Sequence, residues 1–297
     1  MSSFVISVDS TGDRFAPDLD NQSVHHVTMK RIQNGVEVAE HFENANQANA
    51  FYESIKKGLL PTTVAINEFE HGEHFKRILK STKGDIIHLT LSSGLSLTYD
   101  NAAKAAEEIN VGLKSRRIYV VDTLVATIGI DCMIDELVRL RDKNVPVIEA
   151  IDRIKNLRDH LQGWVISGDL FHLRRGGRIS GVKATIGTIL NVKPIITINR
   201  NGKLAIESKQ RGASNAISYI IDKMNELGER ANPNFLNQAI YLTRTGESQL
   251  YSDFKSAIQK KYPNIEIKES HVCPIIGTHL GAGSVIALWE GAERLEI

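Results

Sequence analysis

The stretch LTLSSGLSLTYDNA, residues 89–102, joins an apolar run typical of a buried strand to a helix predicted to begin near residue 94. Three serines, Ser92, Ser93 and Ser96, occupy the junction together with Gly94. A helix cap requires only one hydroxyl, and for any single serine capping is the simpler interpretation. Free backbone N–H groups and the helix dipole favour an anion at such an end, and a glycine allows a ligand to approach the backbone closely. Together these residues predict a site for a carboxylate or a phosphate.

Strand and helix patterns alternate on both sides of this stretch. In the first half, a buried strand that ends in a small polar turn is predicted within 4–13, further strands at 85–91 and 117–122, an Asn34-Gly35 hairpin within 24–41, and helices at 46–60, 73–82, 128–143 and 147–161. In the second half, strands are predicted at 164–167, 193–210 (with an Asn201-Gly202 turn), 238–244 and 264–270, helices at 213–227 and 252–262, and a glycine-rich loop with a final strand at 273–290. This order predicts an α/β protein of two α/β domains, residues 1–160 and 161–297, with parallel or mixed sheets.

The composition is that of a globular protein without a strong electrostatic bias. The 297 residues include 36 basic and 35 acidic side chains, so the net charge of +1 gives no field that favours nucleic acid. Two distant cysteines argue against a disulfide framework or a cysteine zinc site. The N-terminus does not resemble a signal peptide, and no apolar run approaches the ~20 residues of a membrane span. We therefore expect a cytoplasmic protein without stable membrane insertion.

Three further motifs could contact a ligand. Pro61-Thr62-Thr63 is a small polar segment, for which capping of the following helix is the simplest interpretation. RRGGRIS (174–180) and the KQRG segment ending in Gly212 contain the guanidinium groups that suit carboxylate or phosphate. GTHLGAG (277–283) places His279 among three glycines, which suggests close backbone approach to another group.

Metal and nucleophile motifs are not evident. His25 and His26 should point to opposite faces of a strand, and His71 and His74 are expected on a solvated surface. The sequence contains no GxxxxGK[ST], GxGxxG or GxSxG motif in the required context, and no carboxylate cluster suited to magnesium. We therefore expect neither a catalytic residue, nor a metal, nor a cofactor.

Eight segments occur in the order found in the DegV family of bacterial fatty-acid-binding proteins, which the chain resembles over essentially its whole length. They are DSTGD, LSSGLSLTY, DTLVATIG, LRRGGRIS, LNVKPI, NGKL, KQRG and IIGTHLGAG. The resemblance implies an EDD-type fold of two α/β domains, with a long-chain fatty acid in a tunnel between them. It also implies a binding protein rather than an enzyme. In some members the acid is presented to an ATP-dependent fatty acid kinase related to dihydroxyacetone kinases.

The same resemblance assigns roles to particular positions. It implies that hydroxyls and a histidine hold the carboxylate: Thr62, Thr63, Ser92, Ser93, Ser96 and His279. Arg178 and Arg211 match arginines near the ligand head group or the kinase-docking face. The chain departs from the family at TTVAI, at Leu97, and at Leu280 and Ala282 after the histidine. These departures bear on the preferred acyl chain and on the kinase partnership.

Other functions compete with this one. An enzyme or sensor could bind a phosphorylated small molecule at the serine corner and the arginine loop. Such a protein would need a compact polar cleft with a base or a metal site, whereas a fatty acid carrier needs a long apolar tunnel. A regulator that senses lipid would use the same site as the carrier and differ only in its partner.

Overall fold

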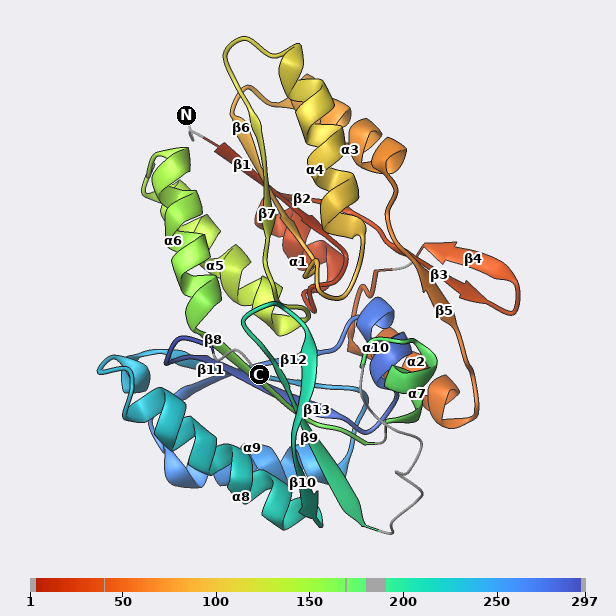
Figure 1. Cartoon of the computed structure of the whole chain (residues 1–297), viewed down its shortest axis with the longest axis vertical. Coiled ribbons are helices and arrows are strands. Elements are labelled where there is room, and N and C mark those ends of the chain that lie inside the picture. The colour runs from red at the N-terminus through yellow and green to blue at the C-terminus, as the bar shows by residue number, and fades with distance from the viewer. Residues whose placement is uncertain (1–3, 40, 169, 180–190, 295–297) are drawn as a thin grey trace.

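The computed structural model describes residues 4–39, 41–168, 170–179 and 191–294 and contains two large sheets, one above the other in Figure 1. The first sheet has the order β2-β1-β6-β7, and all its neighbours are parallel. Its strands are β1 (Phe4–Asp9), β2 (Val24–Val27), β6 (Asp85–Thr90) and β7 (Ile118–Asp122). Such near-continuous apolar runs suit a parallel sheet covered on both faces. One face is covered by α3 (Glu68–Ser81) and α4 (Thr98–Val111), the other by α1 (Ala16–Asn21), α5 (Ile128–Asp142) and α6 (Val147–His160).

The second sheet is mixed and has the order β10-β9-β8-β13-β11-β12, in which only β11 and β12 pair in parallel. Its strands are β8 (Leu161–Ile166), β9 (Val192–Ile198), β10 (Leu204–Arg211), β11 (Ala239–Arg244), β12 (Glu266–His271) and β13 (Val285–Glu290). Helices α8 (Ala213–Met224) and α9 (Gln249–Lys261) cover one face. A π-helical turn (Asn225–Glu229) and a 3-10 turn (Phe235–Asn237) follow α8.

A small third sheet and three short or crossing helices lie beside the junction of the two large sheets (Figure 1). The sheet has the order β4-β3-β5, with β3 (Lys30–Gln33), β4 (Val36–Ala39) and β5 (Thr62–Val64). Its hairpin turns at Asn34 and Gly35, both at positive φ, as a tight two-residue turn requires. The helices are α2 (Ala45–Lys56), α7 (Phe171–Arg175) and α10 (Pro274–Leu280). Although α2 belongs to the first half of the chain, its Phe51 and Tyr52 pack in one cluster with Val165 of the second sheet. The division at residues 160 and 161 thus stays a prediction.

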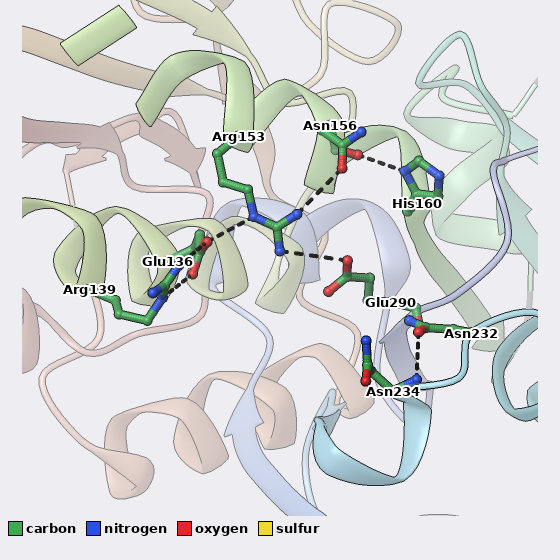
Figure 2. Close-up of polar contacts among 8 residues, drawn as sticks. All are labelled: Glu136, Arg139, Arg153, Asn156, His160, Asn232, Asn234 and Glu290. Carbon is green, nitrogen blue, oxygen red and sulfur yellow. Dashed lines mark hydrogen bonds and ion pairs between the residues drawn. The ribbon is translucent and has the colours of Figure 1, made fainter. Parts of the chain in front are cut away.

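Polar contacts join the two domains on the side where α6 leads into β8 (Figure 2). Glu136 on α5 accepts hydrogen bonds from Arg139 and, over 3.0 Å, from Nε of Arg153 on α6. The same Arg153 guanidinium lies 3.8 Å from the carboxylate of Glu290 at the end of β13. Nearby, Asn156 accepts from Arg153 through its side chain and is bonded through its backbone oxygen to His160. Of these contacts, the ion pair between Arg153 and Glu290 joins a helix of the first domain to the end of β13 in the second.

The structure confirms the two-domain α/β architecture with parallel and mixed sheets, and it corrects several local predictions. The helix predicted from residue 94 begins at Thr98, so the serine segment is a turn. The segment Pro274–Leu280, predicted as part of a loop, is a helix with proline at its first position. Ser180, the last residue of the RRGGRIS motif, lies outside the described residues.

The expectation that His71 and His74 are solvated was also wrong. Their relative exposures are 0% and 3%, because the face of α3 that carries them packs on the first sheet. Asn67 caps this helix in a capping box, so Thr62 and Thr63 have no capping role and lie in β5. Among the described residues, no helix has the length and apolarity needed to cross a bilayer. Within those same residues, no group of three or more histidine, cysteine or acidic side chains is arranged to hold a metal ion.

Candidate functional site

An apolar cavity lies between the two large sheets, on the face of the second sheet that α8 and α9 leave uncovered. Alternation along the strands determines this face. Val165 of β8, Ile196 of β9 and Ile286 of β13 line the cavity. The residues beside them in sequence, such as Trp164 and Ile195, pack on the opposite face with α8 and α9. One face of the second sheet is thus covered by α8 and α9, and the other face lines the cavity.

The first domain supplies the opposite wall of the cavity. Leu91 and Leu95 come from the segment after β6, and Val125 from the segment after β7. These segments follow the carboxyl ends of parallel strands, where open α/β sheets bind their ligands. The cavity volume is about 960 Å³ when the part open to solvent is included. Sixteen of the 22 described residues that line it are apolar, so the cavity suits a hydrocarbon better than a polar metabolite.

The polar lining residues gather mainly at one edge, around a hydrogen bond between Thr63 and His279. Thr63 Oγ1 lies 2.7 Å from His279 Nε2 and joins the small sheet to α10. Ser96 and Arg178 also line the cavity, as does Thr127. Ser96 comes from the serine turn, and its hydroxyl is 2.9 Å from that of Thr98. The structure therefore brings together four of the residues assigned by resemblance: Thr63, Ser96, Arg178 and His279.

The His279 imidazole is neutral near pH 7. Burial lowers its pKa to about 4, and the positive charges of Arg178 and Arg175 act in the same direction. A neutral ring has one N–H donor and one acceptor nitrogen. One proton is used in the hydrogen bond between Thr63 and His279, so the pair keeps one donor for an anion: the Thr63 hydroxyl if Nε2 donates to it, or Nδ1–H if Thr63 donates to Nε2. Gly176 lies against this ring, since a Cβ atom on Gly176 would overlap with His279 Nδ1.

The arginine loop lies beside this edge and bonds to the first domain. Arg178 Nε donates to the backbone oxygen of Leu95 over 3.3 Å, and Arg175 donates to that of Pro61. Arg178 is exposed at the edge of the cavity, so its charge is accessible from outside. Sequence analysis identified Arg178 but missed Arg175, although the RRGGR segment contains both.

The serines of the turn differ in their burial and in their hydrogen-bond partners. Ser92 is fully buried, and its Oγ donates to the backbone oxygen of Gly202 in the β9–β10 turn over 2.8 Å. A Cβ atom on Gly94 would lie 2.6 Å from that same oxygen. The close approach at Gly94 is therefore to the second domain's backbone and not to a ligand, contrary to our expectation. Ser93 is exposed, and its backbone N–H donates to Asp122.

The remaining assigned residues lie outside the cavity lining. Thr62 alternates with Thr63 along β5, so it faces outward and is exposed. Arg211 ends β10, is exposed, and pairs with Val192. The roles of Thr62, Ser92, Ser93 and Arg211 toward a ligand stay predictions. Sequence analysis missed Thr127, whose positive φ of 56° is unusual for a β-branched residue.

Among the described residues that line the cavity, none is aspartate or glutamate. The polar edge consists of hydroxyls, a neutral imidazole and a guanidinium, which can donate hydrogen bonds to an anion. The arrangement can hold one negatively charged group beside a hydrocarbon chain.

Comparison with known proteins agrees with this geometry. The family model described as "uncharacterised protein, DegV family" matches residues 3–290. The DegV domain-containing protein YteA of Lactococcus lactis is 31% identical over 285 residues, which cover 95% of this chain and 96% of YteA. The crystal structure of DegV, a fatty acid binding protein from Bacillus subtilis, has 24% identity and a TM-score of 0.81, with 98% of this chain and 100% of that chain covered.

A stearic-acid-binding protein from Eubacterium ventriosum has the same fold, with a TM-score of 0.82 at 16% identity and 98% of each chain covered. At these identities the solved structures establish the architecture alone. The family is established by the model match and by the similarity to YteA. This chain belongs to the DegV family.

Proposed function

We propose that this protein binds a long-chain fatty acid, with the hydrocarbon in the cavity between the domains and the carboxylate at the edge formed by Thr63, Ser96 and His279. The observation that carries the proposal is the apolar cavity that ends at the Thr63–His279 hydrogen bond. The fatty-acid-binding relatives from Bacillus subtilis and Eubacterium ventriosum support the choice of ligand.

The energetics suit such a ligand. Burial of each methylene contributes about 0.8 kcal/mol, so a chain of ~16 carbons contributes on the order of 12 kcal/mol before the cost of ordering it. A buried carboxylate without partners would lose its hydration at high cost. The Ser96 hydroxyl and the one proton that the Thr63–His279 pair does not use in its own hydrogen bond can replace part of that hydration, and the charge of Arg178 favours the anion. The hydrocarbon thus supplies affinity, and the polar edge fixes the orientation.

In this arrangement the carboxylate lies near the surface, beside the exposed Arg178. The proposal therefore includes a carrier, without a catalytic cycle of its own, that presents the acid to a cytoplasmic fatty acid kinase. Arg178 and Arg211 are its candidates for contact with that kinase or with the head group. A phosphorylated small molecule is a poorer fit, because most of the described lining residues are apolar.

Two measurements test the ligand. Native mass spectrometry of protein purified from bacteria should show a co-purified mass in the range of C14–C18 acids. Delipidated protein should bind palmitate at micromolar concentrations, and a phosphorylated sugar should not displace it. The absence of binding to any C14–C18 acid would refute the proposal.

The carboxylate position is tested by two neighbouring residues of β5. Thr63→Val removes a hydroxyl that lines the cavity, and we expect about tenfold weaker palmitate binding, the equivalent of one hydrogen bond to a charged group. Thr62→Val removes an outward hydroxyl from the same strand and should change the affinity less than twofold. The reverse order of effects would place the carboxylate at Thr62, as the family resemblance alone allows.

A further inference from the structure

The DSTGD loop, Asp9–Asp13, connects β1 to α1 and is buried throughout, with relative exposures of 1% for Asp9 and 3% for Asp13. Of the described residues that line the cavity, none belongs to this loop. Two acidic groups buried at such depth are costly unless they have partners. Their partners are backbone groups at the start of several cavity walls.

Asp9 holds the wall that contains the serine turn. Its Oδ2 accepts a hydrogen bond from the backbone N–H of Leu91 over 2.7 Å, while Oδ1 accepts from the N–H and hydroxyl of Thr11. Leu91 lines the cavity and directly precedes the turn in which the Ser96 N–H bonds back to Ser92. The Asp9 carboxylate thus fixes the starting point of the segment that places the Ser96 hydroxyl.

Ser10 and Thr11 hold two more walls. Ser10 Oγ accepts a hydrogen bond from the backbone N–H of Met29 over 2.8 Å. The backbone oxygen of Thr11 accepts one from the backbone N–H of Thr127 over 2.9 Å. Both Met29 and Thr127 line the cavity. The second bond also holds Thr127 in its strained conformation, which persists only where the surroundings determine it.

Asp13 holds the helix that contains His279. Its Oδ1 accepts from the backbone N–H of Cys273 over 2.9 Å, and Cys273 is the residue that precedes α10. The Asp13 N–H donates in turn to Asp131 Oδ2 on α5 over 3.1 Å. Gly12 permits this packing, because a Cβ atom there would lie 2.7 Å from Asp131 Oδ1. A carboxylate of the first domain therefore fixes the origin of the second domain's histidine helix.

We propose that the loop Asp9–Asp13 is a positioning segment, which sets Ser96, Thr127 and His279 at fixed places around the cavity without touching the ligand. This inference rests on the proposed fatty acid site, because the positioned groups include its carboxylate donors. The loop reaches four wall segments from both domains through at least one hydrogen bond each. It thereby acts as a common reference for groups that lie far apart in the sequence.

The test compares three carboxylates that each accept a backbone N–H. Asp9→Ala and Asp13→Ala remove bonds of the loop, whereas Asp85→Ala removes a more exposed bond of the same kind, to the Arg117 N–H (2.6 Å), at the opposite end of the same sheet. We expect palmitate binding to weaken about tenfold in the first two variants and to stay unchanged in Asp85→Ala. The ring ¹⁵N shifts of His279 in ligand-free protein should change in Asp13→Ala only. Equal losses of affinity in all three variants would show general destabilisation and overturn the proposal.

Amide substitutions sharpen the test and guard against variants that fail to fold. Asp13→Asn keeps an oxygen for the Cys273 N–H and can turn its NH₂ toward the Ser270 hydroxyl, so it should restore the His279 shifts and most of the affinity. Asp9→Asn must place its NH₂ against a donor on either side and should remain impaired. Unaltered affinity in Asp9→Asn would overturn the role of Asp9.

The His279 shifts also separate this inference from the proposed function. If the wild-type protein binds no fatty acid while Asp13→Ala still moves the His279 signals, the ligand proposal fails and the positioning role stands. If the signals do not move in Asp13→Ala, the positioning role of Asp13 fails whatever the ligand.

Discussion

His279 and His74 are each hydrogen-bonded to a hydroxyl group, Thr63 in one case and Ser7 in the other, with the same separation of 2.7 Å. The Ser7 hydroxyl is also 2.8 Å from Nδ1 of His88, and it is fully buried between the two rings. That hydroxyl is enclosed by the protein, whereas the Thr63–His279 pair lines an apolar cavity. The same chemistry is therefore structural at one place and available to a ligand at the other. The surroundings decide which, and residue type alone does not.

The largest effect expected from this contrast is acid lability of the first domain. Burial lowers the pKa of His71 to about 4, that of His74 to about 3, and that of His88 well below its usual value. Between pH 6.5 and 4 the unfolded chain takes up protons at these imidazoles that the folded protein does not, so their contribution to the free energy of unfolding should fall as the pH falls. Asp9 and Asp131, whose pKa values burial raises to about 6, contribute in the opposite direction. The slope should be about 1.4 kcal/mol per pH unit for each imidazole.

Urea unfolding at pH 7.5, 6.0 and 5.0 measures this slope. His74→Gln keeps a hydrogen-bond donor for Ser7 but cannot titrate. The slope should therefore be smaller by the contribution of one imidazole, about 1.4 kcal/mol per pH unit. An equal slope in His74→Gln and in the wild-type protein would contradict the neutrality of His74 in the folded state.

Removal of the Ser7 hydroxyl should affect stability alone. Ser7→Ala leaves nitrogens of His74 and His88 without this partner, and the free energy of unfolding should fall by about 1–3 kcal/mol. Palmitate affinity should remain within twofold, because Ser7 is not among the described residues that line the cavity. Thr63→Val should show the opposite pattern, and similar patterns in the two variants would erase the distinction between the sites.

The smallest effect should follow from a methyl group placed against the functional histidine. Gly176→Ala would push the His279 ring and should weaken palmitate binding by a few-fold. Gly112 is a matched control, since it also follows a helix with right-handed backbone angles, while its nearest neighbour to an added Cβ is 3.7 Å away. Gly112→Ala should leave binding unchanged in the same titration. Equal affinities for the two variants would show that the ring tolerates displacement.

Local patterns in the sequence predicted most strands and helices, because each was encoded by nearby residues. Asn34-Gly35 specified a hairpin, and the apolar run after Asp85 specified a central parallel strand. The errors arose where a distant segment determines the structure. Helix α4 begins at Thr98 and not near residue 94, because the segment after Ser92 forms a turn. The Ser92 side chain in that turn is bonded to Gly202, which lies 110 positions later in the sequence. His71 and His74 are buried because a neutral imidazole can pack against a sheet, which hydropathy does not reveal.

Residue patterns alone predicted an anion site at the serine turn, but only the family resemblance connected that turn with Thr63 and His279. No spacing rule connects Thr63 to His279, since the hydrogen bond between them spans 216 positions. The resemblance identified both residues, but only the geometry of β5 distinguishes Thr63 from the outward-facing Thr62. Neither residue patterns nor the family resemblance predicted the hydrogen bonds of the DSTGD loop. Most of these bonds join a side chain to a backbone group, and backbone groups are the same in every residue type, so the sequence does not indicate which one is the partner.

The contact between Gly94 and Gly202 has a mechanical consequence. The two backbones touch there, with the Ser92 hydroxyl bonded across the junction, while the cavity separates the same two domains a short distance away. A molecule that fills the cavity thus completes the apolar packing between two domains that already touch at Gly94 and Gly202. Protein with a bound ligand should therefore unfold as one cooperative unit. In the ligand-free protein, the part of the domain interface around the cavity should open before the rest unfolds.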